Sequence, residues 1–431
     1  MKLFQQLLVA GTALSLIAPF GAQASDYNIE GMNSYVRKKS SSKKAKQFNS
    51  NSFTNEIATN EEKVDSSESK FTAFEAGTFS DTTTLDSKAV LALGAIDGIG
   101  EIDSSQNEAL QFSYVYQMNL NTSFTGDDNL YVRLKTGTWA DDWKVKGSTY
   151  HIETKDNADI FKLDKVWYTF DIGGITATYG PMIENYYMLA ATPSIYKPGA
   201  LKAFKLGGHS AAFGASTSQG MGLKKEWDNG MAASVTLNSK NADTADGMLT
   251  AEDENKINTM LAYTADNYHI SATYSRQQHG WDAWTYFATA DVAAHGNHAE
   301  MNADAVALRA WWRPENAGTA TPSISLGYDN IKFENHNIAE DASGYMIGLN
   351  WQDMFQADDR IGFAYGQALK VDEAVAGVAK DEVDPSLWEL YYSFKPNDNI
   401  QITPAIFAGS DVLSDTADDI FGAVVSTVFK F

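Results

Sequence analysis

Alternating apolar and polar positions between residues 108 and 139 predict a β-hairpin with two unlike faces. Every second position of its first half is apolar: Leu110, Phe112, Tyr114, Tyr116, Met118 and Leu120. After a Gly-Asp-Asp turn, the second half places Leu130, Val132 and Leu134 on one side and Tyr131, Arg133 and Lys135 on the other. Because successive strand side chains point to opposite faces, a soluble sandwich would bury the apolar face. A membrane barrel would instead turn that face to lipid and direct Arg133 and Lys135 into an aqueous lumen.

The same kind of pattern recurs from residue 83 to the end of the chain and predicts sixteen strands. They are expected near residues 84–96, 107–121, 129–138, 161–172, 175–181, 219–227, 231–240, 255–265, 268–277, 303–313, 322–331, 343–352, 360–368, 387–396, 399–408 and 419–431. Even-numbered connections are short and rich in turn residues, whereas odd-numbered ones run to roughly 10 to 38 residues, an alternation typical of outer-membrane barrels. We therefore predict an all-β, antiparallel, up-and-down transmembrane barrel with periplasmic turns and extracellular loops. The last strand alternates to a C-terminal Phe431 and is expected to pair with the first strand and close the sheet.

The N-terminal part of the chain differs from the barrel in composition. Residues 1–24 combine a short basic start, an apolar stretch and the small-x-small sequence Ala22-Gln23-Ala24, which predicts a cleaved secretory signal. Residues 25–76 are polar and aperiodic, which favours a flexible periplasmic segment. Its Lys/Arg cluster could contact anionic cell-wall polymer, or the segment could be a solvated linker. Residues 77–431 would form the barrel in the outer membrane.

Composition narrows the possible functions further. No segment approaches the eighteen consecutive apolar residues of a transmembrane helix, and the absence of cysteine excludes disulfides and thiol chemistry. The 20 Tyr, 22 Phe and 10 Trp residues suit the aromatic belts that lie at lipid headgroups. A net charge of −22 argues against nucleic acid and favours acidic loops among lipopolysaccharide charges. No cofactor is predicted.

Four stretches of the chain resemble the cyanobacterial outer-membrane porins, within the carbohydrate-selective porin family. They are FEAGTFSDTTTLDSKAVLALGAIDG (74–98), NLNTSFTGDDNLYVRLKTG (119–137), GYMIGLNWQDMFQADDRIGFAYG (344–366) and the closing segment 387–431. The resemblance implies a homotrimeric porin for passive diffusion of small hydrophilic solutes. Family members usually carry a surface-layer-homology domain before the barrel, whereas about fifty polar residues stand in its place here.

The working site of a porin is its constriction, where charges and hydrogen-bonding groups set selectivity. The longest connection, residues 182–218, is the third long loop, and the resemblance implies that it folds into the lumen. Charged or titratable residues of this loop and of the facing strands form the predicted constriction: Glu184, Lys197, Lys202, Lys205, His209, Arg133, Lys135, Arg309 and Arg313. Two interpretations stay open, namely an electropositive eyelet for small anions and lysines that pair with wall carboxylates to hold the loop.

Other functions are weaker alternatives. Tyr186, Tyr187, Tyr196 and Phe204 in the same loop would suit stacking against sugars, or packing of the loop. Ser210 lies in an incomplete nucleophile elbow and would be the residue of a barrel hydrolase. His279, His295, His298 and Glu300 have partial metal-ligand spacing but no fixed third ligand. A structural anchor without useful conductance is the remaining alternative.

Overall fold

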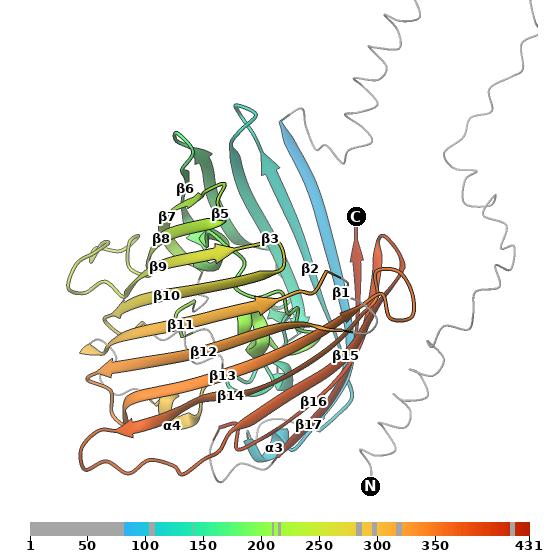
Figure 1. Ribbon diagram of the computed structural model, residues 1–431, viewed down its shortest axis with the longest axis vertical. Coiled ribbons are helices and arrows are strands. Elements are labelled where there is room, and N and C mark those ends of the chain that lie inside the picture. The colour runs from blue at the N-terminus through green and yellow to red at the C-terminus, as the bar shows by residue number, and fades with distance from the viewer. Residues whose placement is uncertain are drawn as a thin grey trace, which may run out of the picture. The chain divides into compact units, whose positions relative to one another are not determined.

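A computed structural model describes residues 82–102, 108–139, 141–208, 211–213, 217–281, 287–294, 300–315, 321–413 and 419–431. The predicted signal and the polar segment 25–76 lie outside the described residues. Within them, the chain forms one antiparallel sheet that closes on itself around a lumen (Figure 1).

The strands follow one another around the barrel in chain order. Their bounds are β1 (Thr83–Asp97), β2 (Gln111–Thr122), β3 (Asn129–Trp139), β4 (Lys155–Asp156), β5 (Lys162–Asp171), β6 (Thr176–Ile183), β7 (Ser218–Glu226), β8 (Met231–Ser239), β9 (Asn255–Thr264), β10 (Tyr268–Gln278), β11 (Asn302–Trp312), β12 (Ser323–Glu334), β13 (Ala339–Gln352), β14 (Arg360–Ala374), β15 (Ser386–Asn397), β16 (Ile400–Ser410) and β17 (Ile420–Lys430).

Sixteen of these strands make the closed ring, as predicted from the sequence. β17 lies antiparallel to β1, with Lys430 opposite Lys88 and Phe421 opposite Asp97, and β1 pairs with β2 on its other side. The two-residue β4 extends the end of β3, while β3 pairs directly with β5 to continue the ring. Because every strand of the ring has two neighbours, the sheet presents no free edge for aggregation.

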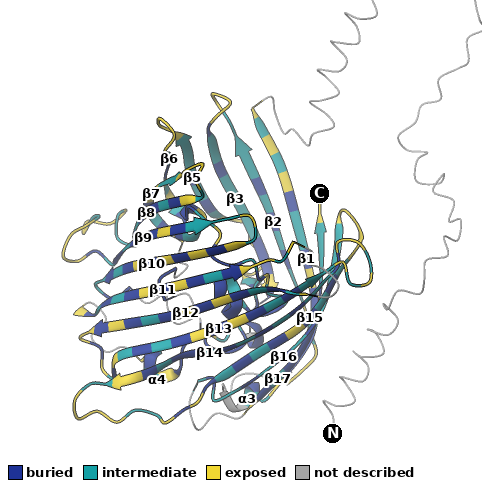
Figure 2. Cartoon of the chain, in the orientation of Figure 1, coloured by how far each residue is buried: buried dark blue, intermediate teal, exposed yellow. Residues whose placement is uncertain are grey.

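Burial alternates along strands such as β8 to β12 in the opposite sense to that of a soluble protein (Figure 2). On β10 the outward Tyr268, Ile270 and Tyr274 are exposed, whereas the inward Ser271 and Thr273 are buried. In the hairpin, Phe112 is 67% exposed, in contrast to the buried, inward Gln117. The prediction that the apolar faces point outward is therefore confirmed, since a lipid environment rewards apolar side chains on the outside.

One predicted connection is wrong. The sequence pattern predicts a long loop between the strands expected at 322–331 and 343–352. In the structure these strands are β12, which continues to Glu334, and β13, which begins at Ala339, so only residues 335–338 separate them. Similarly, β14 continues to Ala374 rather than ending at residue 368. These extensions carry polar outward side chains beyond the apolar band. Backbone pairing continues there regardless of side-chain polarity, so a hydropathy pattern misses it.

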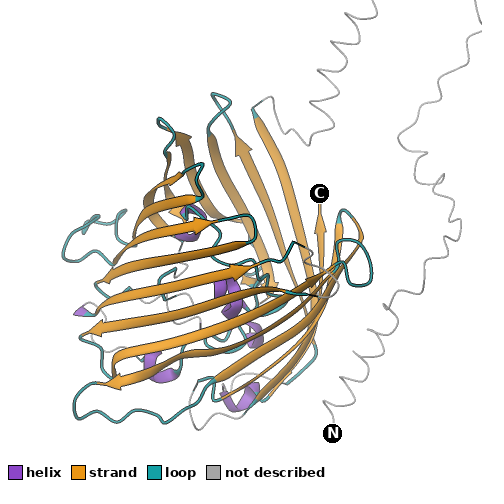
Figure 3. Cartoon of the chain, viewed as in Figure 1, coloured by secondary structure: helices purple, strands orange, loops and turns teal. Residues whose placement is uncertain are grey.

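Short helices occur in the connections (Figure 3). They are α3 (Ile99–Ile102), η3 (Asp141–Lys144), η4 (Asn185–Met188), η5 (Lys202–Gly207) and α4 (Ala290–Ala293). None of the helices in the described part of the chain has the length and apolar content needed to cross a membrane.

Two loops fill part of the lumen. We call residues 140–161, between β3 and β5, the second loop, and residues 184–217, between β6 and β7, the third loop. Tyr196 and Phe204 of the third loop and Trp143 of the second pack in one buried cluster with wall residues such as Met346 and Phe407. The third loop therefore folds inward, as expected. The second loop joins it, which the sequence pattern did not predict.

Candidate functional site

The third loop is held against the barrel wall by one buried carboxylate. Glu389 on β15 points into the lumen and is fully buried. Its two oxygens accept the backbone N–H groups of Gly199 (3.0 Å), Ala200 (3.0 Å) and Leu201 (2.8 Å). The hydroxyl of Tyr196 donates to the same carboxylate at 2.8 Å. Four donors to one anion satisfy backbone groups that the loop itself leaves unpaired.

The second loop is joined to the third by backbone hydrogen bonds. The N–H of Ile152 donates to the carbonyl of Ala200, and the N–H of Lys202 donates to the carbonyl of Tyr150, both at 2.8 Å. The two loops thus form one unit inside the barrel. This unit places Lys202 and Lys205 of the third loop around one cavity with residues of β3 and β5.

The loop unit and the wall enclose a cavity of about 650 Å³, which we call the basic chamber. Nine of its described lining side chains are basic: Lys88, Arg133, Lys135, Lys144, Lys146, Lys155, Lys165, Lys202 and Lys205. Four are acidic: Glu153, Asp156, Asp164 and Glu184. The chamber therefore has an excess of positive charge, although the net charge of the whole chain is −22. A charged cavity with low-dielectric walls concentrates ions of the opposite sign.

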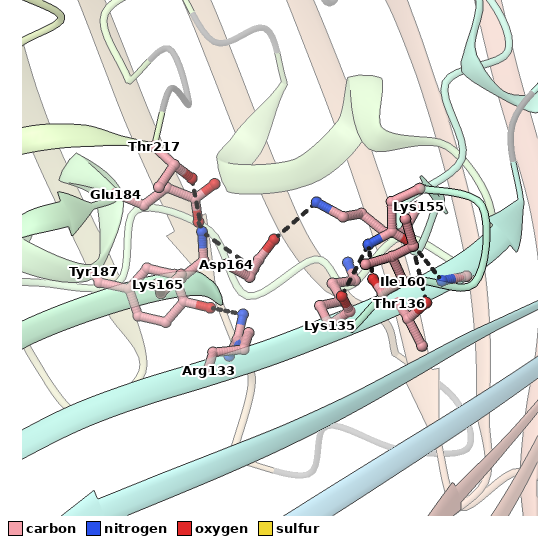
Figure 4. A network of polar contacts seen from close by, with 12 residues as sticks. Arg133, Lys135, Thr136, Lys155, Ile160, Asp164, Lys165, Glu184, Tyr187 and Thr217 are labelled. Carbon is pink, nitrogen blue, oxygen red and sulfur yellow. Dashed lines mark hydrogen bonds and ion pairs between the residues drawn. The ribbon is translucent and has the colours of Figure 1, made fainter. Parts of the chain in front are cut away.

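A β-bulge brings two adjacent charges into the chamber. Arg133 pairs with Lys165, whereas the next residue of β3 pairs with Leu163, so Asp164 is the extra residue. A bulge re-aims side chains that would otherwise alternate. Both Asp164 and Lys165 consequently line the chamber (Figure 4). The Lys165 ammonium lies 2.7 Å from Glu184 and 3.8 Å from Asp164, and it donates to the hydroxyl of Thr217 at 3.1 Å.

Arg133 is oriented by neutral partners. Its Nε donates to Oδ1 of Asn119 at 2.9 Å, and its Nη1 donates to the hydroxyl of Tyr187 at 3.3 Å (Figure 4). The guanidinium also lies 5.4 Å from the ring centroid of Tyr131. Because none of these partners carries a negative charge, they orient Arg133 without neutralising it.

Lysines 202 and 205 lie over aromatic rings at the loop side of the chamber. The Lys202 ammonium is 4.4 Å from the ring centroid of Tyr150, and that of Lys205 is 4.0 Å from the ring of Tyr186. Burial and the neighbouring charge of Lys205 lower the pKa of Lys202 to about 7. Burial also lowers the pKa of Lys205. The charge of the chamber is therefore sensitive to pH near neutrality.

Two acids of the chamber, Glu184 and Glu153, are ionised and partly neutralise it. Although burial opposes ionisation, Lys165 and Lys205 lower the pKa of Glu184 to about 2. The carboxylate of Glu153 receives two hydrogen bonds from Lys88, at 2.9 and 2.7 Å. This partner lowers the pKa of Glu153, again against the effect of burial.

A second cavity, of about 430 Å³, contains the predicted Lys197 together with Arg360, Lys395 and Lys430. The carboxylates of Asp353, Asp358 and Asp359 line it as well, so positive charge does not predominate there. Glu153 and Ile152 of the second loop line both cavities. The second loop therefore separates the basic chamber from the second cavity.

Arg309 does not reach the basic chamber, in contrast to the sequence-based expectation. It is buried and forms an ion pair of 2.7 Å with the equally buried Asp329. Its remaining donors bind the carbonyls of Leu206 (2.9 Å), Leu308 (2.9 Å) and Tyr328 (3.0 Å). With its donors engaged in this way, Arg309 anchors the third loop through Leu206 rather than offering charge to a solute.

Of two other predicted residues, Arg313 lies apart from the chamber and His209 lies outside the described residues. Arg313 follows β11, is exposed, and donates to the carbonyl of Asp266 at 3.2 Å. His209 lies outside the described residues, as do Ser210, His295 and His298. Of the predicted constriction residues, the structure brings together Arg133, Lys135, Glu184, Lys202 and Lys205.

The aromatic residues of the third loop divide into two groups. Tyr196 and Phe204 are buried in the packed cluster, which agrees with a packing role. Tyr186 and Tyr187 line the basic chamber, with their rings stacked at 4.9 Å between centroids.

Several chamber residues escaped the sequence-based prediction. Lys165 precedes the buried Trp167 by two residues on β5 and therefore shares its face, so its inward position could have been read from the period of two. Lys144, Lys146 and Lys155 lie in the second loop or the short β4, where no periodic signal exists. Only the packing of the second loop into the lumen places them.

Two uncharacterised proteins are similar to this chain in sequence. The chain matches no protein-family model. It is 24% identical over 418 residues to an uncharacterised protein of Nostoc sp., covering 88% of this chain and 70% of the relative. An uncharacterised protein of Synechocystis sp. is 21% identical over 386 residues, covering 80% and 68%.

Two solved structures resemble the barrel. Pseudomonas putida OprB superposes with a TM-score of 0.54 at 11% identity, over 81% of this chain and 94% of that one. A loop-deletion mutant of OmpT, an outer membrane protein of Vibrio cholerae, gives a TM-score of 0.52 at 9% identity, over 81% and 100%. At such identities the likeness establishes a shared barrel fold.

Proposed function

We propose that this protein is an outer-membrane porin through which small hydrophilic solutes diffuse passively, with a preference for small inorganic anions. The observation that carries the proposal is the basic chamber, which gathers nine cationic and four acidic side chains inside a closed barrel. Phosphate, sulfate, bicarbonate and chloride are solutes of the matching charge. The function requires no catalytic group and no cofactor.

The arrangement of the cations supports conduction rather than tight binding. Arg133 lies among neutral partners and keeps its charge available, while Lys165 is paired with Glu184. Conduction needs sites that attract an ion but release it again. A mixture of available and paired cations meets this requirement better than a uniformly unpaired cluster.

Reversal potentials in a salt gradient across a planar bilayer test the proposal. We expect the purified protein to prefer anions, and a variant carrying Arg133→Met, Lys135→Met and Lys205→Met to lose most of this preference. The matched control replaces Lys332, an outward lysine that is 73% exposed, by Met and should leave selectivity unchanged. Cation preference in the unmodified protein would exclude the anion assignment.

Sugar permeation is a second candidate, favoured by the two tyrosines that line the chamber, Tyr186 and Tyr187. Cations already lie over or beside these rings: Lys205 over Tyr186 and Arg133 near Tyr187. Aromatic faces engaged in this way are less available for stacking on a sugar. Liposome swelling with uncharged mono- and disaccharides distinguishes the two candidates, because an anion pore of this kind would give slow swelling.

The assembly and location of the porin form part of the same proposal. We infer a homotrimer embedded among outer-membrane lipid and lipopolysaccharide, exported by cleavage after residue 24. The polar segment 25–76 would lie in the periplasm, with its basic cluster available to cell-wall polymer. Detergent-extracted protein analysed by native mass spectrometry, together with N-terminal sequencing of the mature chain, tests both points.

A further inference from the structure

A second, separate cationic group lies inside the barrel on the wall formed by β8, β9 and β10. Lys256 on β9 points inward and is 1% exposed. Among the described residues, its ammonium has no hydrogen-bond partner and no ion pair. It is also absent from the residues that line the basic chamber. A buried ionisable group of this kind requires a partner of opposite charge or a strongly polar environment.

The nearby carboxylates are engaged elsewhere. Asp253 accepts hydrogen bonds from the Ser239 hydroxyl at 2.6 Å and the Leu249 N–H at 2.7 Å. Glu254 forms an ion pair with Lys240. Neither acid, although only two or three residues away in the chain, neutralises Lys256.

Two neutral N–H donors close to Lys256 also lack acceptors. They are Nδ2 of Asn258, two residues further along the same inner face, and Nε1 of Trp281, whose ring centroid lies 5.8 Å from the Lys256 ammonium. Both side chains are at most 2% exposed. Several unpaired donors buried together are rare in native proteins, and such groups are usually satisfied by an ordered water or a bound ion.

The strands beside β9 supply oxygens that can solvate part of the ammonium. Asn238 on β8 and Gln277 on β10 lie opposite Lys256 in the two ladders (β8–β10 in Figure 1). Oδ1 of Asn238 and Oε1 of Gln277 are buried and lack donors. Together with Oδ1 of Asn258, which also lacks a donor, they can accept the three ammonium protons, but these neutral oxygens leave the positive charge itself without a counter-charge.

We propose that Lys256, Asn258 and Trp281 hold one small monovalent anion of the chloride type as a fixed structural ion. A single negative charge neutralises the ammonium, and a spherical halide accepts N–H donors from several directions. The enclosure of these side chains makes the ion part of the folded barrel rather than a conducted species. This site is independent of the basic chamber and does not rest on the proposed function.

Bromide, which replaces chloride and scatters anomalously, tests the proposal directly. Crystals of the unmodified protein grown in bromide should show an anomalous peak within hydrogen-bond distance of Lys256 Nζ. The unfolding midpoint in detergent should rise with bromide or chloride relative to gluconate at equal ionic strength, because a ligand that binds only the folded state stabilises it. Gluconate serves as the reference because it is too large for an enclosed site.

The variant Lys256→Met should lose this halide-dependent shift, whereas the exposed-lysine control Lys332→Met should keep it. Absence of an anomalous peak at Lys256 would overturn the proposal, as would a halide dependence that persists unchanged in Lys256→Met. Should Lys256→Met fail to fold, the diffraction experiment on the unmodified protein decides alone.

Discussion

The Tyr196 hydroxyl donates a hydrogen bond of 2.8 Å to the Glu389 carboxylate, although 193 positions separate the two residues in the chain. Tyr196 belongs to the third loop and Glu389 to the inner face of β15. The same carboxylate accepts three backbone N–H groups of that loop. The position of the loop, and with it one side of the basic chamber, is therefore set by the barrel wall.

Removal of the Glu389 carboxylate should release the third loop. We expect Glu389→Ala to lower the free energy of unfolding by about 3–5 kcal/mol, since four donors, three of them buried, lose their acceptor. Denaturant titration in detergent measures the loss, and single-channel recordings should show larger, noisier currents. Tyr196→Phe deletes one of the four bonds and should cost about 1 kcal/mol with quiet channels. Equal effects of the two substitutions would contradict the anchoring role of the carboxylate.

Anion preference should fall as pH rises through neutrality. Burial and Lys205 lower the pKa of Lys202 to about 7, so this lysine is charged at pH 6 and neutral at pH 8.5. Reversal potentials measured across this range should show the loss of one positive charge from the chamber.

The variants at Lys202 provide the check on this pH dependence. Lys202→Arg keeps its charge at all these pH values and should remove the dependence. Lys202→Met should show weaker anion preference already at pH 6, with little further change at pH 8.5. A full pH dependence retained in Lys202→Arg would assign the titration to another group.

Glu153 should limit anion passage between the two cavities. It is the acidic residue that lines both of them, and its charge opposes anions at their junction. We expect Glu153→Gln to raise the anion-to-cation permeability ratio about two- to fivefold, which corresponds to the removal of one charge at short range. Asp156→Asn is the matched control, because Asp156 lines only the basic chamber and should have a smaller effect. A larger effect of Asp156→Asn would place the narrowest point elsewhere.

Arg309 and Arg133 should respond in opposite ways to the same substitution. Arg309→Met leaves the Asp329 carboxylate buried and unpaired, so we expect a loss of about 3–5 kcal/mol of unfolding free energy with unchanged selectivity. Arg133→Met should weaken anion preference and cost little stability, since its partners are neutral.

A double variant separates the buried charge from packing. Arg309→Met combined with Asp329→Leu removes both charges and should recover most of the stability lost in Arg309→Met. Denaturant titration measures the recovery. If Arg309→Met alone abolished anion preference in a folded channel, Arg309 would belong to the conducting path after all.

The inner-face position of a charged residue could be predicted from the sequence, but its pairing inside the barrel could not. Arg133 and Lys135 were placed correctly on the inner face, because side-chain alternation is a property of each strand alone. Arg309 also points inward, as its place in the alternating pattern of the strand predicts, but its charge is neutralised by an ion pair with Asp329 on the next strand. The alternating pattern cannot predict such an ion pair, because the pair depends on which inward side chains of neighbouring strands meet.

The sequence by itself determined a closed sixteen-stranded antiparallel barrel with apolar side chains outside. The period of two and the order of short and long connections are local properties of the chain and can be recognised without knowing which distant residues meet. The tertiary structure alone decided that the second loop enters the lumen and that nine cations converge on one chamber. It also decided that the bulge turns Asp164 toward the same space, next to Lys165. These outcomes rest on contacts between residues far apart in the chain, whose energies depend on distance and burial rather than on any repeating pattern.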